Sequence, residues 1–266
     1  MPTISVNLIG PITVELNGNR VSGFRSGKTL AILAYLVCER RVVSRNFLAH
    51  LFWPDKSYEE GRGHLRRALH DLSSRLPDSI ESDYHTVRFN PAYLPHTDIH
   101  RLELLLTSSD RCAREAAAAL CRGELLEGLV LENCPDFDVW LLVERELWRI
   151  KAIHLVEGLL KEHSAAGNYD QAISYAWQLL RFEPWREDIH YHLMVLLIQA
   201  GMPALALKQY KLCRKILLGE LNIEPSTETT RLYIQLRNSV SSSAHTWPYG
   251  DSVMEGSTPS IEKTGL

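Results

Sequence analysis

The chain has 266 residues, of which 45% are hydrophobic, and a formal net charge of −3. This length allows two folded domains, and no apolar run approaches the roughly 20 residues that a membrane-spanning helix needs, so no membrane partner is expected. Residues 1–95 contain 12 Lys and Arg against 9 Asp and Glu, whereas residues 96–266 contain 17 against 23. This asymmetry permits nucleic-acid binding by the first part only.

The first 24 residues contain two alternating apolar runs, ISVNLIG and ITVELNGNRV, with an Asn-Gly pair inside the second. This pattern is typical of short antiparallel strands joined by tight turns. Helical patterns follow at 28–40, at 44–53 with Ser44 as a plausible N-cap, and at 59–76. Residues 79–91 then indicate two more short strands with a polar tip. Residues 1–96 are therefore predicted to form an α+β winged helix-turn-helix domain.

The Gly-Lys-Thr at 27–29 raises the alternative of a nucleotide-binding loop. That motif needs a glycine five positions before Gly27, where Ser22 stands instead, and the preceding segment is polar and rich in turn residues. We therefore expect Lys28 and Thr29 to open a helix and expect no nucleotide binding. One buried face of this helix is predicted to carry Leu30, Leu33, Ala34 and Val37.

Residues 98–240 read as a succession of amphipathic helices separated by glycine and proline. AGNYDQAI (166–173) matches AGMPALAL (200–207) at an offset of 34 residues, which is the tetratricopeptide period. An all-α tetratricopeptide-like repeat domain is thus predicted over 97–238. The Ser-, Thr-, Gly- and Pro-rich residues 239–266 are expected to be a disordered tail or a linker.

No pattern indicates an enzyme. The sequence shows no catalytic triad, no paired-carboxylate site and no cofactor motif, and the aromatic residues of the helical part are expected to fill its core. The five cysteines, at 38, 112, 121, 134 and 213, form no CxxC and no metal-type pairing with histidine, which favours reduced thiols in a cytoplasm. No catalytic residue, cofactor or metal site is predicted.

The helix expected at 59–76 has two chemically distinct faces. Its inner face carries Leu65, Leu69, Leu72 and Leu76, and its opposite face carries Gly63, Arg67, His70 and Ser74, flanked by Arg66 and His64 with Arg62 nearer the core edge. On an isolated helix such arginines usually serve only as a solvated surface. As the third helix before a hairpin, this one can present its donors to the major groove of double-stranded DNA.

Two neighbouring segments complete the candidate DNA-binding surface. Residues 44–46 begin the preceding helix, where backbone N–H groups can meet a phosphate, and residues 85–88 lie in the hairpin. Glu59 and Glu60 count slightly against tight non-specific binding. The candidate DNA-binding residues are Arg67, His70, Arg66, His64, Ser74, Arg62, Ser44, Arg45, Asn46, His85, Thr86 and Arg88.

Several motifs resemble one known family. FRSGKTLAILAYLV, SRNFLAHLFWPD, GHLRRALHDLSSRL and TVRFNP resemble the OmpR-like winged-helix domain of SARP-type bacterial transcriptional regulators. LCRGELLEGL, FDVWLLVERELWRI, GNYDQAISYAWQLLRFEPWRED and LNIEPSTETTRLY resemble the bacterial transcriptional activator domain (BTAD) of that family. The resemblance covers about residues 3–237, in the family's order.

The resemblance implies an activator that binds direct repeats near promoters, often as a side-by-side homodimer, and contacts RNA polymerase. It places Arg66, Arg67 and His70 in the major groove and the hairpin around residues 85–88 on the minor groove or backbone. His64 stands where the family commonly has asparagine, and Gly61 and Gly63 replace better helix formers. Larger relatives append an ATPase or sensor region, so the chain is expected to be a short regulator or an N-terminal fragment.

Three hypotheses follow from the sequence. The leading one is a sequence-specific DNA-binding transcriptional activator, cytoplasmic and associated with the nucleoid. The alternative is a protein-interaction scaffold whose winged helix no longer binds DNA, and an NTPase is the third. DNA affinity that falls with salt and depends on Arg67 would separate the first two, and nucleotide binding abolished by Lys28→Ala would support the third.

Overall fold

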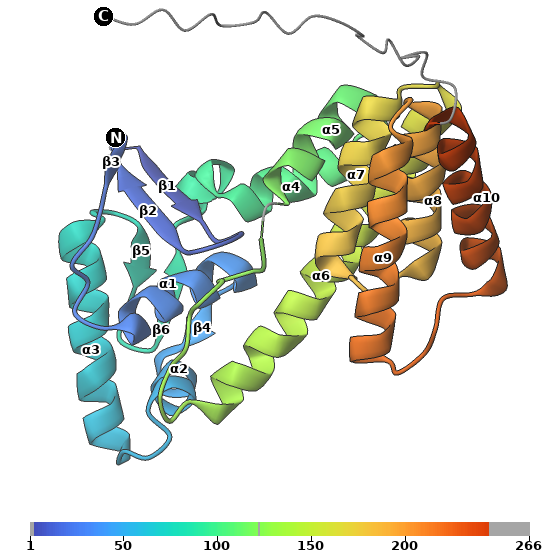
Figure 1. Ribbon diagram of the computed structural model, residues 1–266. Helices are drawn as coiled ribbons and strands as arrows, with labels where there is room; N and C mark the ends of the chain where they lie inside the picture. Colours follow the sequence, from blue (N-terminus) through green and yellow to red (C-terminus); the bar gives the residue numbers. More distant parts are fainter. Residues whose placement is uncertain (1–2, 122, 245–266) are drawn as a thin grey trace, which may run out of the picture. The chain divides into compact units, whose positions relative to one another are not determined.

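The computed structural model describes residues 3–121 and 123–244 (Figure 1). By compactness the chain divides into two units, Met1–Pro184 and Trp185–Leu266, each of which is described by itself. Among the described helices none is long and apolar enough to cross a membrane.

The chain begins with a small antiparallel sheet, as the alternating apolar pattern predicted. Its strands are β1 (Ile4–Asn7), β2 (Thr13–Leu16) and β3 (Asn19–Arg20), hydrogen-bonded in that order. Asn17 and Gly18 link β2 to β3 with φ angles of 53° and 80°, which is the geometry that favours an Asn-Gly pair in a two-residue hairpin turn.

Three helices follow, each opened by a serine. They are α1 (Gly27–Glu39), α2 (Arg45–Phe52) and α3 (Tyr58–Arg75), and each N-cap hydroxyl accepts a hydrogen bond from a backbone N–H of the first turn. The predicted helices, and Ser44 as an N-cap, are confirmed to within a residue or two of their expected ends.

Helix α1 is buried more completely than one amphipathic face would require. Leu33, Ala34 and Val37 are fully buried as predicted, Leu30 is only half-buried, and Ile32 and Leu36, from other faces of the helix, are also fully buried. The prediction of a single buried face was thus too narrow. Helix α1 contacts both α3 and the strand β6, and the ring of its Tyr35 lies 4.8 Å from that of Trp140, a residue far along the chain.

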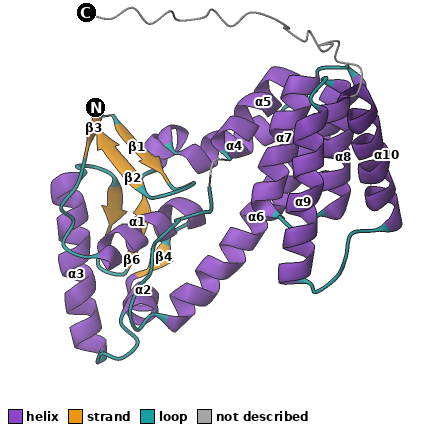
Figure 2. Cartoon of the chain, viewed as in Figure 1, coloured by secondary structure: helices purple, strands orange, loops and turns teal. Residues whose placement is uncertain are grey.

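The N-terminal region contains a second small sheet, whose strands are orange in Figure 2. Its strands β4 (Val43–Ser44), β6 (Thr86–Phe89) and β5 (Ile80–Ser82) pair antiparallel in that order. The β5–β6 hairpin was predicted, but the two-residue strand β4 was not, because so short a strand leaves no periodicity in the sequence. It brings the start of α2 beside the hairpin, since Ser44 pairs with Thr86.

A 3₁₀ helix, η1 (Pro91–His96), leads into the helical part of the first unit. The helices there are α4 (Asp98–Leu106), α5 (Arg111–Leu120), α6 (Pro135–Ala165) and α7 (Tyr169–Phe182). The buried carboxylate of Asp98 accepts hydrogen bonds from the backbone N–H groups of Leu8 and Ile9, each at 2.8 Å. The last described strand, β6, ends at Phe89 and the described elements after it are all helical, but residue 96 is not the edge of a compact unit, because the first unit runs to Pro184.

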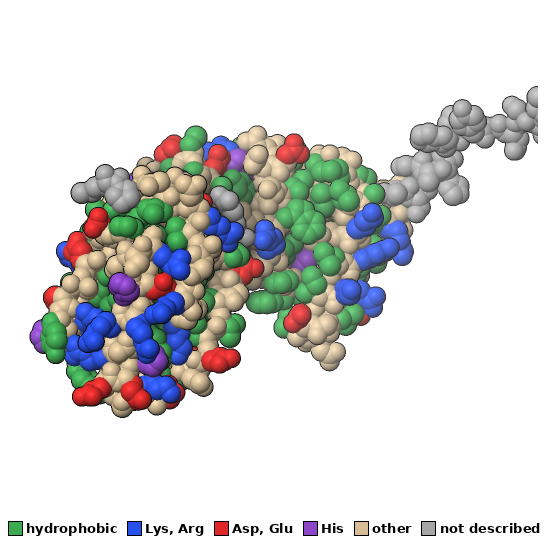
Figure 3. Space-filling model, turned by 90° about the vertical axis from the view of Figure 1, so that its left-hand side faces the viewer, with side chains coloured by type: hydrophobic (Ala, Val, Ile, Leu, Met, Phe, Trp, Pro, Cys, Tyr) green, Lys and Arg blue, Asp and Glu red, His purple; other side chains and the backbone are tan. Residues whose placement is uncertain are grey.

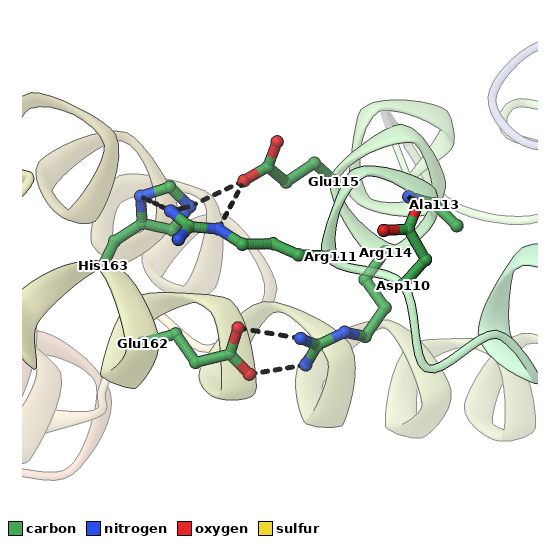
Figure 4. A network of polar contacts seen from close by, with 7 residues as sticks. All are labelled: Asp110, Arg111, Ala113, Arg114, Glu115, Glu162 and His163. Carbon is green, nitrogen blue, oxygen red and sulfur yellow. Dashed lines mark hydrogen bonds and ion pairs between the residues drawn. The ribbon is translucent and has the colours of Figure 1, made fainter. Parts of the chain in front are cut away.

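Helix α5 is joined to α6 by two groups of charged contacts (Figure 4). Arg114 donates to both carboxylate oxygens of Glu162, at 2.5 and 2.8 Å. Beside this pair, the buried ring of His163 lies 3.0 Å from Glu115 Oε1 and 3.0 Å from Arg111 Nη2. These contacts fix the register of the two helices.

The second unit contains α8 (Glu187–Gln199), α9 (Pro203–Glu220) and α10 (Thr227–Ala244), and α9 packs on both of the others. The two copies of the predicted repeat share their local conformation: Gly167 and Gly201 both have positive φ, at 72° and 74°, and Ala172 and Ala206 are both fully buried. Residues 239–244 of the predicted tail are helical, and 245–266 lie outside the described residues.

Candidate nucleic-acid interface

Helix α3 has the predicted orientation. Leu65, Leu69 and Leu72, together with Leu76 at its end, are buried, whereas Arg66, Arg67, His70 and Ser74 are exposed. A Cβ at Gly61 would lie 3.6 Å from the Cβ of Ala49 on α2, which is an ordinary van der Waals contact, so the packing of the two helices does not require glycine at this position.

The first turn of α3 is fixed by a capping box. Ser57 Oγ accepts a hydrogen bond from Glu60 N at 3.4 Å, and Glu60 Oε2 accepts one from Ser57 N at 3.1 Å. Hydrogen bonds from the side chain and backbone of Ser57 lower the pKa of Glu60. This acidic residue therefore has a structural partner at the helix start.

Arg62 joins three elements of the surface. Its Nη1 donates to Tyr58 Oη at 2.9 Å and to Asn46 Oδ1 at 3.2 Å, and its Nη2 donates to the carbonyl of Tyr84 at 3.1 Å. The guanidinium also lies 5.0 Å from the ring centre of Tyr84 and 5.6 Å from that of Tyr58. Arg62, predicted as a DNA contact, thus connects α3 to the start of α2 and to the hairpin. The two tyrosines, which are exposed, were not among the residues predicted from the sequence.

The hairpin tip is organised by Asp83. Its carboxylate accepts hydrogen bonds from the backbone N–H groups of His85 and Thr86, each at 2.7 Å, and from Thr86 Oγ1 at 2.9 Å. The backbone hydrogen bonds lower the pKa of Asp83. Arg45 reaches the same tip from α2, with Nη1 donating to the carbonyl of Asp83 at 2.8 Å.

A stacked group extends the surface along α3. Arg67 Nη2 lies 3.0 Å from His64 Nδ1, and the His64 ring stacks on Trp53 with 5.5 Å between ring centres. Lys28 Nζ lies 5.5 Å from the centre of the Trp53 ring and donates to the carbonyl of Phe52 at 2.6 Å. Lys28 therefore contributes to the packing of α1 beside the end of α2.

The remaining candidate residues differ in whether their side chains form contacts with neighbouring groups of the protein. Ser44 Oγ caps α2, Ser74 Oγ donates to the carbonyl of His70 at 2.8 Å, and Arg88 pairs with Glu81 on the neighbouring strand at 2.7 Å. The His70 side chain has no hydrogen-bond partner among the described residues. The ring of His85 lies edge-on to Tyr84, with 4.8 Å between ring centres.

The charges on this surface are unbalanced. Within the described chain, no carboxylate forms an ion pair with any of the four arginines 45, 62, 66 and 67. Burial, and then the positive charges of Arg62 and Arg66, lower the pKa of Arg45. At the edges, by contrast, Arg75 pairs with Asp71 and Arg88 with Glu81. Figure 3 shows Lys, Arg and His side chains gathered on the face to which α3 belongs.

Comparisons with known proteins show which family the chain resembles. The sequence model of the bacterial transcriptional activator domain matches residues 97–237. Transcriptional regulator RedD of Streptomyces coelicolor is 25% identical over 262 residues, with 88% of this chain and 70% of RedD covered. Regulatory protein AfsR of Streptomyces griseus is 24% identical over 237 residues, with 85% of this chain but only 24% of AfsR covered.

A solved structure has a related fold. EmbR of Mycobacterium tuberculosis, determined in complex with a low affinity phosphopeptide, gives a TM-score of 0.58 at 18% identity, over 90% of this chain and 66% of EmbR. The similarity covers both the N-terminal region of this chain, which contains its small sheets, and the helical domain that follows. Since the family match covers more than half of the residues, the chain belongs to the bacterial transcriptional activator domain family and is a transcriptional regulator of the SARP type.

Proposed function

We propose that the chain is a sequence-specific DNA-binding transcriptional activator. In this proposal residues 1–96 act as a winged helix-turn-helix, with α3 as recognition helix and the β5–β6 hairpin as wing. Residues 97–238 act as a tetratricopeptide-like module. The order of the elements α1, α2, α3, β5 and β6 supports the first assignment, and the matched glycines and alanines of the 34-residue repeat support the second.

The observation that carries the proposal is the set of four arginines without a carboxylate partner. Arg45 comes from α2, and Arg62, Arg66 and Arg67 come from α3. Burial, and then the charges of Arg62 and Arg66, lower the pKa of Arg45, and the nearby Asp83 offsets this only in part. Bringing like charges together without counter-charges costs free energy. A row of phosphates would supply the missing negative charge.

The geometry suggests different roles for the candidate residues. Arg66, Arg67 and His70 are exposed on α3 and suit base edges in the major groove. Arg45 and Asn46, at the start of α2, suit phosphates. Arg62 is a positioning residue, because its hydrogen bonds hold the hairpin to α3 and α2.

The proposals on oligomeric state, protein partners, location and enzymatic activity are based on the family. We propose binding to promoter direct repeats as a homodimer, contact with RNA polymerase through the helical part, action in the cytoplasm at the nucleoid, and no enzymatic activity or cofactor. The similarity to RedD, a transcriptional regulator, and to AfsR, a regulatory protein, supports a role in the regulation of transcription.

Binding of the chain to its own upstream intergenic duplex and to a scrambled duplex tests the central proposal. The Arg67→Ala variant should bind the native duplex more weakly or less selectively. Arg101→Ala removes one exposed positive charge from α4 and serves as the matched control. If the folded chain binds neither duplex, the DNA-binding proposal is wrong and the scaffold alternative replaces it.

A further inference from the structure

The first unit contains a cavity of about 390 Å³ away from α3. It is bounded by the segment after β1, by α4, by residues 123–127 and by the facing parts of α6 and α7. Its apolar walls come mainly from Ile9, Leu102, Leu125, Trp148, Ala152 and Phe182. This volume, with apolar walls that include an aromatic ring, is typical of small-molecule sites.

The arginines that line the cavity already have partners. Arg145 donates to the carbonyls of Leu125 and Leu126, each at 2.8 Å. Arg149 bonds Glu146 at 2.7 Å and Glu183 at 3.0 Å. These two guanidinium groups are therefore structural, and Arg181, the third arginine of the lining, also has an interaction partner, so none of the three is open to an anionic ligand.

Two hydrogen-bond acceptors at the cavity, unlike its arginines, are open to a ligand. Gln178 Nε2 donates to the carbonyls of Ala118 and Cys121, at 3.0 and 3.1 Å, which leaves its Oε1 without a hydrogen-bond partner in the described part of the chain. The Glu127 carboxylate likewise has no side-chain partner among the described residues. It lies over Gly123, where a Cβ would be 2.5 Å from Glu127 Oε2. The lining thus offers acceptors to a ligand that brings donors.

We propose that this cavity is an effector site for a small cationic amphiphile: a flat aromatic body carrying an amine. The ring would lie on the apolar walls beside Trp148, and the ammonium would meet the Glu127 carboxylate and Gln178 Oε1. This site is independent of the DNA-binding proposal, because none of its lining residues belongs to the α3 surface.

The cavity wall is attached to the first sheet, which gives a bound ligand a route to the N-terminal region. Gly10 N donates to the carbonyl of Glu124 at 2.8 Å, Leu126 N to that of Leu8 at 2.8 Å, and Glu127 N to that of Gly10 at 3.0 Å. Leu126 has a φ of 51°, a left-handed conformation that disfavours leucine. A ligand that contacts residues 124–127 would stabilise this segment against β1.

Two probes with the same ring and opposite charge test the site: 1-naphthylmethylammonium and 1-naphthoate. Each is titrated into the full chain without DNA and followed by ligand-observed saturation-transfer NMR. The cation should bind saturably, and the carboxylate more weakly. Glu127→Lys should weaken binding of the cation by about fivefold, as for an exposed ion pair, and should reduce or reverse the preference between the probes.

Glu132→Lys is the matched control, because Glu132 is an exposed residue of the same connecting segment that does not line the cavity. It should leave both affinities unchanged. Ala152→Phe, which fills the cavity, should abolish binding of both probes; if that variant fails to fold, the two glutamate variants alone decide. No saturable binding, a preference for the carboxylate, or equal effects of Glu127→Lys and Glu132→Lys would overturn the proposal.

Discussion

Replacing Arg66 by alanine gives a quantitative test of the arginine surface. Arg66 is exposed and has no ion-pair partner among the described residues, so its loss should leave the fold intact. Each neutralised phosphate adds about 0.9 to the slope of log affinity against log salt. If each of the four arginines 45, 62, 66 and 67 neutralises about one phosphate charge at the DNA surface, whether its own contact is to a base edge, to a phosphate or to the hairpin, a slope of about −3.6 per protomer follows, or roughly 150-fold weaker binding at about 200 mM than at about 50 mM salt.

The Arg66→Ala variant should reduce the slope to about −2.7 and the loss of affinity over the same range to roughly 40-fold. Fluorescence anisotropy of a labelled duplex at several salt concentrations measures both values. Arg101→Ala, which removes the same charge from α4, should retain the wild-type slope. An unchanged slope for Arg66→Ala, or an equal reduction for Arg101→Ala, would refute the reasoning.

Three further outcomes are expected. Arg62→Met should raise amide hydrogen exchange at residues 83–86 by roughly fivefold, because it removes hydrogen bonds that are worth about 1 kcal/mol in total; unchanged exchange would show that the hairpin does not depend on Arg62. Arg114 lowers the pKa of Glu162, so this half-buried pair should stabilise the fold above the unfolded-state pKa and lose its effect as the pH falls through the folded-state value. Urea unfolding of Glu162→Gln should then show a deficit below about 1 kcal/mol at neutral pH that disappears in acid, and a deficit that persists in acid would contradict this. Leu65→Ala, at a fully buried site, should lower the free energy of unfolding by about 3 kcal/mol in the same assay, and a change below about 1 kcal/mol would contradict the assigned core face.

Local patterns predicted most of the N-terminal elements. The leucine spacing of α3 identified its buried face, and the Asn-Gly pair identified the first tight turn. The complete burial of α1 could not be predicted in this way. It depends on contacts with α3 and β6 and on Trp140, which reaches Tyr35 from α6, and hydrophobic periodicity carries no information about such distant partners.

The sequence predicted which side chains of the candidate interface are exposed, but it did not predict the hydrogen bonds that these side chains form with one another. Helical angles alone showed that Arg66 and Arg67 point away from the core. The contact of Arg62 with the carbonyl of Tyr84 exists only once the hairpin has closed on α3. The hydrogen bond from Arg62 to Tyr58, four residues earlier, is a local signal that could have been found in the sequence.

The buried Asp98 carboxylate bears on how the chain can be divided. A fragment that ends at residue 96 would lose the acceptor for the N–H groups of Leu8 and Ile9, and each unpaired buried donor costs about 1–3 kcal/mol. A fragment that continues to Leu106 keeps α4 and this acceptor. A fragment that keeps these hydrogen bonds therefore includes the first helix of the family's activator domain, and a cut where the strands stop separates the donors from their buried acceptor.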